Sequence, residues 1–414
     1  MGISSFKVRS LKGGYTREAI EFCFGRECRA GSLIGQEFLG EDVRGFVLKN
    51  VRRQLERVLG VEFRREIGCG RYQRTERRAG QRNGSYSRAL MTLYGWLQEI
   101  TVPRLRHGGW RSLVFDRYAR RTGVLDRLIL EGFLLGHSTR KTVRQFKRLL
   151  GTSISPQAVS NVVKALESEV KAFHHRRLKD AYQVLYLDGL WIKIARPLKV
   201  KKVLLVAYGV RPDNSRELLD FMLSPSEGEA SWWGFLSDIK ARGLRGSFLE
   251  VLVHDGCAGL LKALSALYPR VKRQWCVFHK LSDISGNLIE RANRSRIVKD
   301  AAAIYEAETE KELQERLRFF QATWRQREPK AVRCFMRGFE ATLIYREYEE
   351  PLKTQIKTNN PIERQLQELQ RRIKPFRKFT NDGSAQRIVY GLIAYVLDTQ
   401  WNQKSSQFYT ISFT

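Results

Sequence analysis

Two stretches decide the fold of this chain: VLYLDGLWIKI at residues 184–194 and EVLVHDGCAGL at residues 250–260. Each carries a run of aliphatic, β-branched or aromatic residues typical of a buried strand, interrupted by an Asp-Gly pair, Asp188-Gly189 or Asp255-Gly256. A carboxylate near the carboxyl end of a strand points into the crevice where open α/β sheets bind ligands. Neighbouring strands lie about 4.8 Å apart, so the two carboxylates predict a site for a pair of divalent cations. Taken alone, each Asp-Gly has a second interpretation as a common turn dipeptide.

The composition is strongly basic. The chain has 414 residues and a formal net charge of +31, which allows two or three domains with a sizeable core. Residues 1–187 hold 36 Lys and Arg against 17 Asp and Glu, so the amino-terminal part is the more basic per residue. Such an excess favours a polyanionic partner, and nucleic acid is the usual one.

Six cysteines in a chain of this length do not indicate a disulfide framework. We interpret them as reduced thiols in a cytoplasmic, nucleoid-associated protein. Cys23 and Cys28 have four residues between them, and no second pair follows at metal-binding spacing, so buried thiols are favoured over a zinc site. No charged start followed by an apolar signal core and no run of 18 apolar residues occurs, which argues against secretion and membrane insertion.

A dense group of arginines lies between a helix expected at 44–60 and a pair of strands expected at 89–104. Only two acidic residues accompany eight arginines here, and Asn83-Gly84 is expected to form a tight turn. Guanidinium groups match phosphate geometry with paired hydrogen bonds, so phosphate contact is favoured over a solvated loop. The candidate DNA-binding residues are Arg64, Arg65, Arg71, Arg74, Arg77, Arg78, Arg82 and Arg88.

The segment from Gly136 to Val163 predicts two short helices in succession. Ser138 or Thr139 can cap the first helix, and Ser155 before Pro156 is a start signal for the second. Two helices joined by a glycine turn predict a helix-turn-helix, whose second helix enters the major groove of DNA. An ordinary pair of packed helices is the alternative. The side chains expected to face DNA are Gln157, Ser160, Asn161 and Lys164.

Residues 181–278 predict one mixed sheet. Strands are expected at 184–194, 203–210, 217–223, 249–254 and 271–277, with helices at 229–241 and 257–268. The first three strands predict an antiparallel meander, and the two that alternate with helices predict parallel additions. A five-stranded mixed sheet of this order is the ribonuclease-H-like arrangement of the α/β class. A long helical region follows at about 279–350, with Trp324, Phe335 and Phe339 as expected buried residues.

The stretch KTNNPIERQLQELQRRIKPFRKF at 357–379 predicts an amphipathic helix. Asn360 is expected to cap it, with Pro361 at the first helical position. Glu363 lies in the first turn, where two interpretations are equally supported: a capping box that hydrogen-bonds back to the Asn360 amide, or a metal ligand. The basic continuation of this helix adds candidate DNA contacts at Arg371 and Arg372.

Four short motifs follow one another in the second half of the chain: YLDG at 186–189, DGCAGL at 255–260, QWCVFHK at 274–280 and TNNPIER at 358–364. Together they resemble the Mutator-like transposases of bacterial insertion sequences. The spacing also fits that family, with 67 residues from Asp188 to Asp255 and 108 from there to Glu363. The arginine-rich segment and the helix pair look like the same family, so the resemblance covers roughly residues 45–400.

This resemblance implies a ribonuclease-H-like core with an Asp-Asp-Glu metal triad and a helical insertion before the Glu. Carried over, the triad is Asp188, Asp255 and Glu363, which would be both the catalytic residues and the ligands of two Mg²⁺ ions, with Mn²⁺ as a substitute. Cys276 and His279 match the family's Cys-x-x-His, which we interpret as structural and adjacent to the site. A zinc site there would lack an evident second ligand pair.

Two positions depart from the family pattern. Trp275 stands where Arg is usual beside the Cys, and Gln365 stands where an Asn is common after the Glu. Neither is expected to touch the carboxylates, so the metal chemistry is not in doubt.

The activity implied is DNA transposition. The enzyme would bind terminal inverted repeats, hydrolyse a phosphodiester at the element end and join the 3′-hydroxyl to target DNA by transesterification. Its partner would be double-stranded DNA, and a homodimer is expected because two element ends must be paired. Two alternatives remain: a catalytically silent DNA-binding protein derived from a transposase, and a nuclease of this fold that cuts without joining.

We expect five parts along the chain. They are an amino-terminal helical or dimerisation region at 1–60, a basic, mainly helical DNA-binding region at 61–180, the first part of the core at 181–278, the helical insertion at 279–355, and carboxyl-terminal core helices with Glu363 at 356–414.

Overall fold

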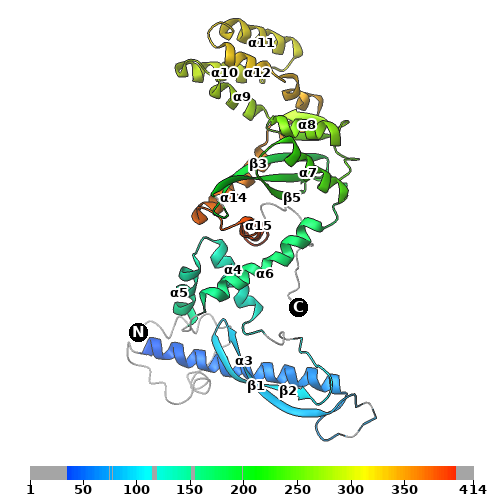
Figure 1. Ribbon diagram of the computed structural model, residues 1–414, viewed down its shortest axis with the longest axis vertical. Helices are drawn as coiled ribbons and strands as arrows, with labels where there is room; N and C mark the ends of the chain where they lie inside the picture. The colour runs from blue at the N-terminus through cyan, green and yellow to red at the C-terminus, as the bar shows by residue number, and fades with distance from the viewer. Residues whose placement is uncertain are drawn as a thin grey trace, which may run out of the picture. The chain divides into compact units, whose positions relative to one another are not determined.

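The computed structural model describes residues 35–397, except residues 74, 77, 114–118, 151–153 and 198. The interpretation of Cys23 and Cys28 therefore falls outside the described residues. Within the described residues, the chain forms two compact units, one of residues 35–132 and 138–159, the other of residues 133–137 and 160–397 (Figure 1). Among the described helices, none has the length and apolar character needed to span a membrane.

The first unit contains a long helix that packs on a β-hairpin (Figure 1). The helix α3 is Gly35–Ile67, and the strands are β1, Arg82–Thr92, and β2, Gly95–Leu105. Their shared core is made by Leu59, Leu90, Leu97, Ile100 and Val102. The helix extends past the predicted end at residue 60 because Phe63 and Ile67 continue the buried face of Leu59 at four-residue spacing.

The hairpin corrects the turn predicted at Asn83-Gly84. These two residues lie inside β1, where the register with β2 shifts between Arg82 and Ser85 and Gly84 has a φ of +66°. The turn lies instead at residues 93–94, where the Thr92 hydroxyl accepts the Tyr94 amide at 3.2 Å. A glycine with positive φ is found both in strand irregularities and in tight turns. The Asn-Gly dipeptide alone therefore does not distinguish a strand irregularity from a turn.

Three helices follow the hairpin: α4, Gly123–Leu134, α5, Thr139–Leu150, and α6, Pro156–His175. Both predicted caps are confirmed, because Ser138 Oγ accepts the Lys141 amide at 3.2 Å and Ser155 Oγ accepts the Ala158 amide at 3.1 Å. The second helix was predicted to be short, but α6 has 20 residues. Its buried face continues through Val163, Leu166, Val170 and Phe173.

The second unit contains the predicted five-stranded mixed sheet, which is confirmed. Its strands are β3, Val184–Ile194, β4, Val200–Val210, β5, Arg216–Ser224, β6, Val251–His254, and β7, Lys272–Trp275. Their order is β5-β4-β3-β6-β7. The pairs β3–β4 and β4–β5 are antiparallel, whereas β3–β6 and β6–β7 are parallel. The arrangement is compatible with a ribonuclease-H-like fold.

Two helices cover one face of this sheet: α7, Glu229–Ala241, and α8, Ala258–Leu267. Alternate residues Leu185 and Leu187 of β3 join Trp232 and Leu236 of α7 and Leu264 of α8 in the main core. Because side chains alternate along a strand, residues 184, 186 and 188 face the opposite side. On that side, α14 packs against β3.

A helical insertion leaves the sheet after β7 and returns before α14. Its helices are α9, Val277–Gly286, α10, Arg294–Ile304, α11, Glu310–Trp324, α12, Pro329–Met336, and α13, Leu352–Ile356. The predicted buried residues Trp324, Phe335 and Phe339 are confirmed. The chain then forms α14, Asn360–Ile373, and α15, Asp382–Gly391, followed by a short π-helix, Leu392–Val396.

Candidate active site

Of the first two predicted carboxylates, Asp188 lies in β3 and Asp255 directly follows the adjacent parallel strand β6. Tyr186 of β3 is opposite Val253 of β6, and two residues further along each chain come Asp188 and Asp255. The register ends at Tyr186 and Val253, and the electrostatic interaction of Asp188 with Asp255 and Glu363 indicates that the three carboxylates lie near one another. The sheet therefore brings together two residues that are 67 positions apart.

Asp188 is half-buried in a negatively charged setting. Its Oδ1 accepts the Gly189 amide at 2.7 Å, and its Oδ2 accepts the side-chain amide of Asn359 at 3.3 Å. Burial and the charge of Asp255 raise the pKa of Asp188 to about 8, with further contributions from Glu363 and Glu227. Four acidic side chains therefore interact at this point of the sheet, and the arrangement favours a bound cation.

Glu363 enters the site from the first turn of α14, but not as a capping box. The N-cap is Asn359 rather than Asn360, and no side-chain cap hydrogen bond is made. Glu363 donates its backbone amide to the Asn359 carbonyl at 2.9 Å. Its Oε1 is buried and has no hydrogen-bond partner among the described residues. The capping-box interpretation is therefore wrong, because Pro361 is accommodated one position later in the helix than predicted and the carboxylate points elsewhere.

The Cys-x-x-His pair lies directly against Glu363. His279 Nδ1 is 3.5 Å from Glu363 Oε1, too far for a hydrogen bond with good geometry. Ligand atoms of Cys276, His279 and Glu363 all lie within 4.8 Å of one another, and within the described ranges this is the one group of three potential metal ligands at that spacing. The carboxylate oxygens of Asp188, Asp255 and Glu363 do not form a group at that spacing.

The Cys276 thiol joins the start of α9 to the start of α14. Its Sγ accepts the Asn359 backbone amide at 3.1 Å, and its own amide donates to the His254 carbonyl at 2.8 Å. Burial raises the pKa of Cys276 to about 11. This setting suits a positioning role for the thiol.

The donor set suits a hard divalent cation. Asp188, Asp255 and Glu363 offer carboxylate oxygens, the ligands that Mg²⁺ prefers. Asn359 Oδ1 is buried without a hydrogen-bond partner among the described residues, as is Glu363 Oε1. Buried oxygens of this kind are normally satisfied, so these two atoms fit the coordination of a cation at the site.

Sequence reasoning missed two residues here, Asn359 and Glu227. Glu227 precedes α7, and a Cβ added to Gly189 would lie 2.5 Å from its Oε1, so the carboxylate packs over the glycine that follows Asp188. Burial and the charge of Asp255 raise the pKa of Glu227, and a hydrogen bond from Trp191 partly offsets this. Asn359 stood in the quoted motif TNNPIER, but Asn360 was taken as the cap.

The Asp255 turn packs against Trp275. Gly256 has a φ of +92°, and a Cβ there would lie 2.0 Å from Trp275 Cε2. Asp255 Oδ1 accepts the Cys257 amide at 2.9 Å, which holds the turn in place. Trp275 is one of the two departures from the family pattern. Its ring packs against Gly256, the residue that follows the candidate site carboxylate Asp255.

The predicted DNA-contacting arginines differ in their surroundings. Arg64, Arg65, Arg71 and Arg78 are exposed, and Arg74 and Arg77 lie outside the described residues. Arg82 and Arg88 are half-buried and donate to the backbone carbonyls of Cys69 and Ala119. These last two side chains therefore hold the protein's own loops.

The other predicted contacts lie on α6 and α14. The four α6 side chains are exposed: Gln157, Ser160, Asn161 and Lys164. On α14, Arg371 and Arg372 both form ion pairs with Glu368, at 2.7 and 2.9 Å. Pairing within the helix reduces the charge that these two arginines can offer to DNA.

The chain matches the family model "Transposase, Mutator family" over residues 33–404. It is 32% identical over 372 residues to the transposase for insertion sequence element IS256 in transposon Tn4001 of Staphylococcus aureus, which covers 89% of this chain and 93% of that protein. It is 29% identical over 371 residues to the transposase for insertion sequence element IS905 of Lactococcus lactis, covering 89% and 92%. The transposase for ISRM5 of Rhizobium meliloti is 29% identical over 343 residues, covering 83% and 85%.

Proposed function

The chain belongs to the Mutator family of transposases, and from this we propose that it binds the terminal inverted repeats of an insertion sequence and moves that element by metal-dependent DNA cleavage and strand transfer. The curated relatives are insertion-sequence transposases that align with this chain over most of its length. Its partner is double-stranded DNA at the element ends and at the target. The active form is a homodimer that pairs two ends, and it acts at the nucleoid.

The observation that carries the proposal is the convergence of three acids from distant parts of the chain. Support comes from the parallel pairing of β3 with β6, which ends two residues before Asp188 and two residues before Asp255. The Asn359–Asp188 hydrogen bond further supports it, because Asn359 is the N-cap of α14, the helix that carries Glu363. The electrostatic interaction of Asp188 with both other acids supports their closeness. A site of this composition suits phosphodiester chemistry better than a binding-only role.

The three carboxylates would hold two Mg²⁺ ions, which supply a deprotonated nucleophile and stabilise the leaving oxygen when bound. Mn²⁺, which shares the preference for oxygen ligands, would substitute. The protein's own residues orient these ligands. Asn359 fixes one oxygen of Asp188, the Gly189 amide fixes the other, and the Cys257 amide fixes Asp255 Oδ1. Groups that orient metal ligands in this way keep a site prepared for the reaction.

The test is cleavage and joining of labelled duplex DNA that carries the terminal repeat of the element encoding this chain. We expect 3′-end cleavage followed by strand transfer in Mg²⁺ and none in EDTA. Asp188→Ala, Asp255→Ala and Glu363→Gln should each lower cleavage by at least about a hundredfold, since losing even a group that only orients a metal ligand costs about ten- to a hundredfold.

The matched control is Glu368→Gln, a carboxylate on the same helix that pairs with Arg371 and Arg372 instead of facing the site. DNA binding should survive in all four variants. Tight binding without cleavage by the unaltered protein in Mg²⁺ and Mn²⁺ would favour a silent DNA-binding protein. Cleavage without joining would favour a nuclease.

A further inference from the structure

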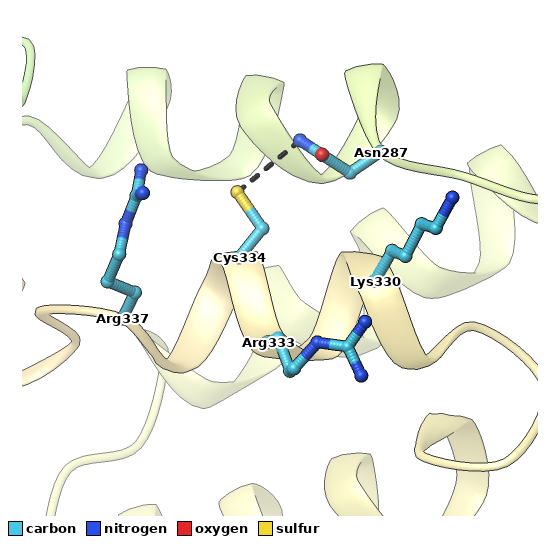
Figure 2. Close-up of a pocket in the computed structure, with 5 residues that line it drawn as sticks. All are labelled: Asn287, Lys330, Arg333, Cys334 and Arg337. Carbon is cyan, nitrogen blue, oxygen red and sulfur yellow. Dashed lines mark hydrogen bonds between the residues drawn. The ribbon is translucent and has the colours of Figure 1, made fainter.

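The helical insertion contains a pocket of about 350 Å³ between α9 and α12 (Figure 2). Its lining comes from Asn287 at the end of α9 and from Lys330, Arg333, Cys334 and Arg337 on α12. Three of the five lining residues are cations, and no carboxylate lines the pocket. The pocket therefore presents concentrated positive charge to solvent.

The three cations lie on α12 and at its C-cap, Arg337, with the Arg333 side chain extending away from α9 in Figure 2. Lys330, Arg333 and Arg337 follow the spacing i, i+3, i+7, which stacks side chains on successive turns. All three are exposed, and none forms an ion pair with a described residue. Figure 2 shows Lys330 and Arg337 extending from α12 on the side of α9. Cations on successive turns of a helix, with no carboxylate among the pocket's lining residues, favour an anionic ligand.

The nearest acid in sequence does not neutralise them. Glu328 is buried, and its carboxylate accepts the amides of Ile289 and Glu290 and the side-chain amide of Asn293. The floor of the pocket is likewise occupied, because the Asn287 side-chain amide donates to the Asp283 carbonyl at 2.8 Å and to Cys334 Sγ at 3.4 Å. The donors left for a ligand are the ammonium and the two guanidinium groups, which match phosphate oxygens.

A buried lysine fixes this pocket to the candidate active site. Lys280, next to His279 in α9, is fully buried and donates to the carbonyls of Cys334 at 2.9 Å and of Arg337. Its ammonium also lies 3.9 Å from the centre of the Trp275 ring. One turn further along α9, Asp283 interacts electrostatically with both Asp255 and Arg337. The Arg337 end of the pocket is therefore the end nearer the carboxylates.

We propose that this pocket binds a backbone phosphate of the DNA strand whose scissile phosphate lies at Asp188, Asp255 and Glu363, an inference that rests on the proposed function. His279 and Asn287 are eight residues apart on α9, or about 12 Å at a rise of 1.5 Å per residue. One strand of B-form DNA advances about 3.4 Å per nucleotide. The bound phosphate would thus lie within a few nucleotides of the scissile one.

The experiment replaces single phosphates of the terminal-repeat duplex with neutral methylphosphonates and measures the affinity of the full chain for each duplex. The pocket variant carries Lys330→Ala, Arg333→Ala and Arg337→Ala. The matched variant carries Lys311→Ala, Arg318→Ala and Arg325→Ala, which removes the same charge from exposed positions of α11 in the same insertion. Both variants change only exposed side chains, so both should fold.

We expect the unaltered protein and the matched variant to lose roughly tenfold in affinity at one phosphate within a few nucleotides of the cleavage point. The pocket variant should bind natural DNA roughly tenfold more weakly and show no further loss at that phosphate. Identical profiles for the pocket and matched variants, with DNA still bound and cut, would overturn the pocket inference alone. Inorganic phosphate binding that depends on the pocket, with identical profiles, would assign the pocket to a free anion. A protein with no preference for terminal-repeat DNA would overturn the proposed function as well.

Discussion

At the scale of single residues, Asn359 connects more of the site than any predicted ligand. Its side-chain amide donates to Asp188, its backbone amide donates to Cys276, and its carbonyl accepts the amide of Glu363. It is completely buried. Asn359 thereby connects Asp188, Glu363 and Cys276 through hydrogen bonds.

Replacing Asn359 with Ala should therefore weaken the reaction without removing a carboxylate. We expect cleavage to fall about ten- to a hundredfold, the usual cost of losing a group that orients a metal ligand. A positioning role also predicts that more Mg²⁺ is needed for half-maximal cleavage, which a magnesium titration measures. The control is Asn360→Ala, since Asn360 is exposed and makes no cap. Equal magnesium requirements in the two variants would argue against the role.

Asp188 should make the metal-free protein less stable as the pH rises. Burial and neighbouring acids raise the pKa of Asp188 to about 8, against about 3.9 in an unfolded chain. The unfolded state loses this proton at lower pH than the folded state, so the folded state loses stability from about pH 4 to about pH 8. In EDTA at pH 8, Asp188→Asn should melt roughly 5 °C or more above the unaltered protein.

Thermal melts at pH 8 and pH 5 check this expectation, because the advantage of Asp188→Asn should shrink at the lower pH. Added Mg²⁺ should raise the melting temperature of the unaltered protein more than that of the variant. A variant that melts below the unaltered protein at both pH values would show that the Asn359 and Gly189 hydrogen bonds outweigh the repulsion.

The acids themselves were predictable from the sequence, whereas their supporting residues were not. Asp188 and Asp255 follow apolar runs whose strand character is plain, and Glu363 stands in a recognisable motif. The contact between Asn359 and Asp188 joins residues 171 positions apart. Local sequence patterns predict helix starts and turns. They do not predict which residue of a distant strand will accept a hydrogen bond from a side-chain amide such as that of Asn359.

At the scale of elements, the turn after β6 depends on a glycine and a ring. A Cβ at Gly256 would clash with Trp275, and the φ of +92° is costly for any other residue. Gly256→Ala should therefore lower the free energy of unfolding by roughly 2 kcal/mol or more, and it should also reduce cleavage because Asp255 is the preceding residue.

Urea unfolding measures the stability change, with Gly286→Ala as the matched control. Gly286 ends α9 with nothing within 4 Å of an added Cβ, so this change should be neutral or stabilise by up to about 1 kcal/mol. If both variants unfold at the same urea concentration, Trp275 can move away and the turn is not rigid.

Element boundaries were predictable where burial follows a single period. The bounds of β3 and α7 agree with the prediction, because continuous apolar runs and a plain helical pattern mark them. The hairpin in the first unit was harder, since β1 begins among exposed polar residues whose strand conformation is set by pairing with β2. Tertiary pairing overrides local preference in such segments.

At the scale of the whole molecule, the net charge of +31 should control DNA affinity. If six or more phosphates are neutralised, affinity should fall by roughly a thousandfold between 50 and 200 mM salt. Arg64, Arg65 and Arg71 are all exposed. Replacing all three with Ala should reduce the slope of log affinity against log salt concentration by an amount that corresponds to up to about three phosphate contacts.

Gel-shift titrations at several salt concentrations give this slope. The paired variant Arg371→Ala with Arg372→Ala should change the slope less per residue, because Glu368 already neutralises part of that charge. Equal changes per arginine would mean that DNA separates these ion pairs on binding.

The two ends of the helical insertion contact each other, which affects how related chains can vary in sequence length. Asn359 meets Cys276 across 83 positions, and the Val277 amide donates to the Lys357 carbonyl at 3.1 Å. The first and last residues of the helical insertion therefore lie side by side and are joined by hydrogen bonds. Segments whose ends lie close together tolerate insertion and exchange. Descendants could lengthen, shorten or trade this segment while the acids beneath it keep their places.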